Sequence, residues 1–179
     1  MELSRHQRRI LLVQAIFLWE DLLKRKPEIA DNELDQQYVL EYIWKNMQEN
    51  TSNEAINDFD HERFFGMVKQ LESLRSMIVQ YAPEWPLEKI ASHDRAILYL
   101  GAYELLYTDV PTPVIINEAV ELAKEFGSER SSKFINGVLS SINKEKAKAG
   151  STLRTLRTLQ TLKTLKTLPP PHGLLPPHR

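Results

Sequence analysis

Three arginines near the start of the chain have the spacing of a single helical face. Arg5, Arg8 and Arg9 stand at positions i, i+3 and i+4, which lie on one side of an α-helix. Cations near a helix N-terminus oppose the helix dipole, so helix stability does not account for them. The planar guanidinium group donates two hydrogen bonds to one anion. The spacing therefore indicates a phosphate contact, with a solvated charged face as the alternative.

The other residue types that carry chemistry form no recognisable catalytic or metal site in the sequence. The chain has five histidines and no cysteine, which excludes a thiolate metal site and a cysteine nucleophile. No two histidines have the spacing of a zinc site. Glu118, Glu121 and Glu125 share a helical face, for which solvent or a basic partner is favoured over a metal. We expect no enzyme activity, no cofactor and no metal.

Charge is distributed unevenly along the 179 residues. Residues 1–150 hold all 24 acidic residues and 18 of the 23 basic ones, whereas residues 151–179 carry five basic residues and no acidic one. An acidic main part excludes a general polyanion binder, so a nucleic-acid contact needs a local basic patch. The apolar run after Arg9 is too short to span a bilayer and lacks a cleavage site, which predicts a cytoplasmic protein with no membrane contact.

The elements that must position these side chains are all predicted to be helices, because apolar residues recur at helical spacing and no window alternates like a strand. Pro83 and Pro86 mark a break between an N-terminal half, 1–82, and a C-terminal half, 86–149. Gly101 and Gly137 fall inside helices and predict close helix–helix approach. The expected helices are 4–24, 33–48, 60–81, 92–107, 113–126 and a last one that starts at Ser128 or Ser131 and ends at 148, with a short turn at 87–91 and a loop at 49–57.

The last 29 residues have a different character. Thr-Leu-Arg and related triplets repeat with a period of three and lead into a proline-rich end. A period of three winds the leucines around a helix instead of aligning them on one face. We expect 151–179 to be a low-complexity, disordered basic and proline-rich tail, with an RNA-contacting arm as the alternative.

Several sequence segments, taken in their order along the chain, resemble one bacterial family. They are Asp-Arg-Ala-Ile-Leu at 94–98, Ile-Asn-Glu-Ala at 116–119 and Lys-Phe-Ile-Asn-Gly-Val-Leu at 133–139, with Arg-Arg at 8–9 and Gln-Ala at 14–15 near the start. Together they resemble the bacterial transcription antitermination factor NusB family. The resemblance covers about residues 3–145 and is densest at 94–142.

The resemblance implies an all-α fold of two packed helical subdomains, about seven helices in all, that binds RNA. Family members pair with NusE, a small-subunit ribosomal protein, and bind single-stranded boxA RNA of ribosomal RNA transcripts within an RNA polymerase antitermination complex. Carried over by position, the RNA-binding residues are Arg5, Arg8, Arg9, Arg130, Lys133 and Phe134. The residues expected to face NusE are Phe17, Asp94, Tyr99, Glu118 and Phe126, where Tyr99 replaces an arginine that is usual in the family.

Two alternatives remain open. One is a protein-interaction scaffold or homodimer that keeps this fold without binding RNA, and a homodimer is also possible for the free protein. The other is the NusB-like domain of a ribosomal RNA methyltransferase. The second is disfavoured because only a low-complexity segment follows residue 150, with no room for a cofactor-binding fold.

Overall fold

The computed structural model describes residues 3–30, 36–47 and 53–166. Within these ranges the chain forms eight α-helices and two 3₁₀ turns, and no strand. The predicted all-α class is therefore confirmed. The helices are α1 (Arg5–Arg25), α2 (Gln36–Asn46), α3 (Asn53–Asn57), α4 (His61–Lys69), α5 (Leu71–Tyr81), α6 (Ser92–Tyr107), α7 (Thr112–Phe126) and α8 (Glu129–Lys166), and the 3₁₀ turns are η1 (Pro27–Ala30) and η2 (Leu87–Lys89).

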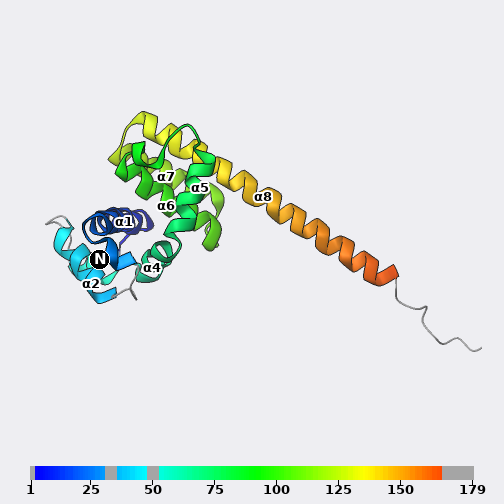
Figure 1. The fold of residues 1–179 in the computed structure, drawn as a ribbon, viewed down its shortest axis with the longest axis horizontal. Helices are drawn as coiled ribbons and strands as arrows, with labels where there is room; N and C mark the ends of the chain where they lie inside the picture. The colour runs from blue at the N-terminus through cyan, green and yellow to red at the C-terminus, as the bar shows by residue number, and fades with distance from the viewer. Residues whose placement is uncertain (1–2, 31–35, 48–52, 167–179) are drawn as a thin grey trace, which may run out of the picture. The chain divides into compact units, whose positions relative to one another are not determined.

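Helix α6 is the centre of the fold. It packs against α1, α5 and α7, as Figure 1 shows. Every residue from Asp94 to Ala102 is buried, so α6 has no solvent-facing side along this stretch. A helix that is apolar nearly all round belongs in the interior of a bundle. The motif at 94–98 is thus a core segment, and it fixes the positions of the helices that pack around it.

Two expected elements differ from the structure. The expected helix 60–81 is two helices, because Gln70 leaves helical dihedral angles (φ −98°, ψ 6°) and caps both α4 and α5. The break lies one turn after Gly66, where a Cβ atom would meet the Tyr103 hydroxyl at 2.0 Å. The expected loop at 49–57 contains the short helix α3.

The two interior glycines of the C-terminal half behave differently. A Cβ atom on Gly101 would lie 2.6 Å from Cδ1 of Leu139, so α6 and α8 approach closely at this position, as predicted. A Cβ atom on Gly137 would meet nothing within 4 Å. The prediction of a close approach at Gly137 is wrong, because this residue lies on the exposed side of α8.

The chain divides into two compact units, 1–143 and 144–179. The division into halves 1–82 and 86–149 stays a prediction. Helix α8 continues to Lys166, through a stretch that we expected to be disordered. Residues 151–166 contain five leucines, two arginines and two lysines, which favour a helix, together with five threonines, which do not, and no proline or glycine. The rest of the expected tail, 167–179, lies outside the described residues.

Candidate nucleic-acid interface

The first turn of α1 is fixed by a capping box. The Ser4 hydroxyl accepts a hydrogen bond from the Gln7 backbone N–H, and the Gln7 side chain accepts one from the Ser4 backbone N–H. This reciprocal pair satisfies two backbone donors at the helix start. The first turn carries no acidic residue, so nothing within it offsets the charge of the arginines that begin the helix. The helix therefore starts at Arg5 with a defined orientation.

Arg9 lies in the core and not on the surface. Only 4% of its area is exposed, and its Nε donates to both carboxylate oxygens of Glu104 on α6 at 3.2 and 3.1 Å. Arg63 on α4 donates to the same carboxylate. Because Arg9 is enclosed and already paired, we leave it out of the RNA surface. The sequence contains an indication of this burial, because Arg9 has helical spacing to Leu12 and Ile16, which lie on the buried stripe of α1.

Arg5 and Arg8 have the exposure that Arg9 lacks. Arg5 is exposed and forms no ion pair with the residues that the structure describes. Arg8 keeps 35% of its side chain exposed and pairs with Asp58, with 3.0 Å between Nη2 and Oδ1. Asp58 also accepts a hydrogen bond from the Leu3 backbone N–H at 3.0 Å. The structure thus leaves two of the three predicted arginines in contact with solvent at the start of α1.

His6 ties this start to α7. Its Nδ1 lies 2.9 Å from Glu118, and its Nε2 lies 3.1 Å from Glu125. The hydrogen bond to Glu118 is the largest influence on the imidazole and raises the pKa of His6, against the opposing effect of burial. Glu121, the third residue of the predicted acidic stripe, pairs with Lys124 instead. Among the described residues no three acidic or histidine side chains are arranged to hold a metal ion.

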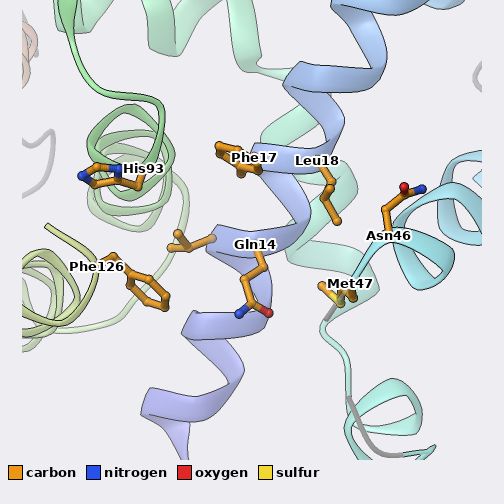
Figure 2. A pocket seen from close by; sticks show the side chains of 8 residues that line it. Gln14, Phe17, Leu18, Asn46, Met47, His93 and Phe126 are labelled. Atoms are coloured by element: carbon orange, nitrogen blue, oxygen red, sulfur yellow. The ribbon is translucent and has the colours of Figure 1, made fainter. Parts of the chain in front are cut away.

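A cavity of about 330 Å³ lies beside the middle of α1. Figure 2 shows Gln14 and Phe17 of α1 between Phe126 and His93 on one side and Asn46 and Met47 on the other. Phe17 is 43% exposed, which is high for a phenylalanine side chain next to a cavity. The structure therefore brings together Phe17 and Phe126, two of the residues expected to face NusE.

The other three expected NusE-facing residues do not line this cavity. Tyr99 is fully buried, and its hydroxyl donates to Glu20 at 3.2 Å. Burial and the nearby Glu20 carboxylate raise the pKa of Tyr99 to about 12. We therefore leave Tyr99 out of the partner surface, since it lies on the enclosed helix α6. Glu118 is half-buried against His6, and Asp94 is 7% exposed at the edge of a different cavity.

The start of α8 presents the remaining predicted RNA residues. Arg130 and Lys133 are exposed, and Lys133 pairs with Glu129 at 2.9 Å. Phe134 is half-buried, and its ring lies 6.0 Å from the ring of Trp85 with an interplanar angle of 60°. Trp85 is absent from the predicted site, although the prolines on either side of it, Pro83 and Pro86, indicate an exposed turn.

Comparison with known proteins gives concordant results. The sequence profile of the NusB family matches residues 6–144. The transcription antitermination protein NusB of a Nitratiruptor species is 36% identical over 148 residues, covering 83% of this chain and 96% of that protein.

Solved structures are similar as well. A structure of T. maritima NusB has a TM-score of 0.61 and 30% identity, covering 81% of this chain and 94% of the other. A structure of the antitermination factors NusB and NusE in complex with double-stranded RNA has a TM-score of 0.54 and 19% identity, and the match covers 80% of this chain and 99% of the other. At this identity it supports the fold alone. The extent of the profile match and the coverage of the relatives show that the chain belongs to the NusB family.

Proposed function

We propose that this chain is an RNA-binding transcription antitermination factor that pairs with NusE and binds boxA-like RNA of ribosomal RNA transcripts. Family membership supports antitermination, because the related protein of Nitratiruptor carries that name. The observation that carries the RNA-binding part is the pair of solvent-accessible arginines, Arg5 and Arg8, at the capped start of α1. The proposal includes no catalytic step, and it places the protein in the cytoplasm.

The proposed RNA surface has two parts. The first is Arg5 with Arg8, whose guanidinium groups contact phosphates of the strand. The second is the start of α8, where Arg130 and Lys133 supply positive charge and Phe134 supplies an aromatic surface. The buried pair of Arg9 and Glu104, which the partly exposed Arg63 joins, links α1, α6 and α4, so it holds the first part in place without contacting RNA.

The proposed NusE surface is the cavity beside α1. Phe17 and Phe126 supply apolar area at its edge, and His93 adds a polar group. Half-exposed aromatic side chains next to a hollow are the usual anchors of a protein–protein interface. Glu118, which is half-buried against His6, and Asp94, which lines the other cavity, do not line this one, so the proposed surface rests on its two aromatic side chains. In the part of the chain that the structure describes, no helix is both long and apolar enough to span a bilayer.

A filter-binding titration with a boxA-like oligonucleotide, with and without NusE, tests the RNA part. The double variant Arg5→Glu plus Arg8→Glu is expected to lose most of its RNA affinity while keeping its helical circular dichroism. Lys24→Glu plus Arg25→Glu is the matched control, because it reverses two charges at the other end of the same helix. Equal affinities for the two double variants would remove the α1 arginines from the interface.

The NusE part is tested separately by size-exclusion chromatography. Phe17→Asp is expected to abolish the complex with NusE and to leave RNA binding by the isolated protein unchanged, because Phe17 is 43% exposed and its loss leaves the core intact. If Phe17→Asp still elutes with NusE as the wild type does, the cavity is not the partner surface. If NusE binds and RNA does not, the scaffold function replaces the proposal.

A further inference from the structure

A second cavity, of about 300 Å³, lies between the turn before α6 and the start of α8. Its aromatic walls are Trp85 and Phe134, which meet edge to face at 6.0 Å. Trp85 is 53% exposed, more than any other large apolar side chain in the described ranges. Leaving an indole ring in water forgoes much of the stabilisation that burial of such a side chain supplies. An exposed aromatic ring beside a cavity indicates a ligand that packs against it.

The charged groups around this cavity are mainly positive. Lys89 and Arg130 line it, both are exposed, and neither forms an ion pair with the described residues. Asp94 also lines it but is buried by its neighbours, and Nε2 of His93 lies 3.4 Å from its Oδ1. The solvent-facing charge is therefore that of two cations. An anionic group next to the aromatic ring would neutralise them.

An aromatic ring beside two cations that pair with no acidic group of the described chain matches the chemistry of one nucleotide in a single strand. An unstacked base has a flat π-face that stacks on tryptophan, and its phosphate pairs with lysine or arginine. A duplex keeps its bases stacked and would leave Trp85 without a partner. An apolar side chain of a protein would cover the ring but would leave Lys89 and Arg130 without counter-charges.

We propose that this cavity, which we term the Trp85 cavity, takes one unstacked base of the bound RNA, with the base on Trp85 and its phosphate near Lys89 and Arg130. The inference rests on the proposed RNA-binding function and adds a base contact to a surface otherwise made of phosphate contacts. Base stacking supplies affinity at one defined nucleotide, whereas the α1 arginines act on the strand as a whole. The Trp85 cavity is separate from the Phe17 cavity, since the two share no lining residue.

The distance between the two RNA contacts sets how much of the strand is engaged. Glu104, which pairs with Arg9 near the start of α1, and Asp94, which lines the Trp85 cavity, are both on α6. Ten residues separate them along the helix, which is about 15 Å at the usual helical rise. The α1 arginines and the Trp85 cavity are therefore expected to engage different nucleotides of one strand. One position within it is expected to depend on Trp85.

An abasic scan of a boxA-like oligonucleotide tests the inference with the full-length protein. Each position of the RNA is replaced in turn by an abasic nucleotide, and affinity is measured for the wild type, Trp85→Ala, Trp85→Phe and the control Val79→Ala. Val79 is the control because it is 49% exposed on α5 and lines neither cavity.

The expected result is a coupling between one nucleotide and Trp85. Trp85→Ala lowers affinity for intact RNA about tenfold to hundredfold, Trp85→Phe retains most of it, and Val79→Ala has no effect. At one RNA position the abasic substitution lowers the affinity of the wild-type protein but does not lower that of Trp85→Ala further. RNA binding also quenches the part of the fluorescence that Trp85→Phe lacks.

Two results would overturn the inference. In the first, the wild type binds RNA, Trp85→Ala binds it equally, and no abasic position couples to Trp85. This result would refute the base contact on Trp85 and would leave the proposed RNA-binding function unaffected. In the second, Trp85→Ala leaves RNA binding intact but weakens binding of NusE, which assigns the cavity to a protein partner. Absence of RNA binding by the wild type itself is a different result, because it refutes the proposed function along with the inference.

Discussion

The buried carboxylate of Glu104 is the clearest place to perturb the positioning of α1. Glu104 is 1% exposed, and it accepts hydrogen bonds from Arg9 of α1 and Arg63 of α4. Glu104→Gln keeps the shape of the side chain and removes its charge, which leaves the Arg9 guanidinium enclosed without its main counter-charge. Breaking a buried pair in this way costs about 3–5 kcal/mol.

That loss is large for a domain of this size, because typical unfolding free energies are about 5–15 kcal/mol. With a urea dependence of about 2 kcal/mol per molar, we expect the midpoint of urea unfolding to fall by about 2 M. Glu121→Gln is the matched control, since Glu121 is exposed and pairs with Lys124 on the surface. Such a surface pair contributes about 1 kcal/mol at most.

A double variant separates the structural role of Arg9 from a role in RNA binding. Arg9→Met with Glu104→Gln replaces the buried pair by neutral groups of similar volume, which is often close to neutral for stability. Arg63 also loses its partner in this variant but keeps 25% of its side chain exposed, so we expect a midpoint between those of Glu104→Gln and the wild type, with wild-type RNA affinity. If Glu104→Gln unfolds no earlier than Glu121→Gln, or if the folded double variant loses RNA binding, the assignment of Arg9 to the core anchor is wrong.

Two further predictions concern stability. Gly101→Ala places a methyl group 2.6 Å from Leu139 in the core, so we expect a net loss of about 1 kcal/mol in unfolding free energy, whereas Gly137→Ala meets open space and gains about 1 kcal/mol from helix propensity. Thermal unfolding of the two variants measures both, and equal signs would contradict the packing at Gly101. The raised pKa of His6 means that its bonds to α7 stabilise the fold fully below pH 6.5 and are lost as pH rises through the folded value. We expect the wild type to lose more unfolding free energy than His6→Gln over that rise, and parallel pH profiles would refute this role of His6.

The boundaries of α6 and α7 were predictable from the sequence. The expected helices 92–107 and 113–126 match α6 and α7 within one residue at each end. Both have strong periodic or continuous apolar patterns and clear stops, and proline near the start of α7 pre-sets its first turn. The break at Gln70 was not predictable, because apolar residues continue at helical spacing through 64–78 without interruption. The break instead accompanies a tertiary contact between Gly66 and Tyr103.

The sequence predicts a basic face at the start of the first helix, but it does not show which of the three arginines reach solvent. Spacing alone placed Arg5, Arg8 and Arg9 on one side of a helix, which is correct for the backbone. Spacing does not show that a carboxylate 95 positions away encloses Arg9. The same holds for Tyr99, whose burial depends on α6 being surrounded by other helices. Long-range partners of this kind enter only with the tertiary structure.

In the proposed complex Arg5 and Arg8 contact RNA phosphates, and Arg9 does not. The most direct measurement is the salt dependence of RNA affinity, because each phosphate contact with a single strand contributes about 0.7 to the slope of log affinity against log salt concentration. We expect Arg5→Gln plus Arg8→Gln to lower the slope by about 1.4 and the folded Arg9→Met, Glu104→Gln variant to keep the wild-type slope. An unchanged slope for the first variant, or a reduced slope for the second, would contradict the proposed contacts.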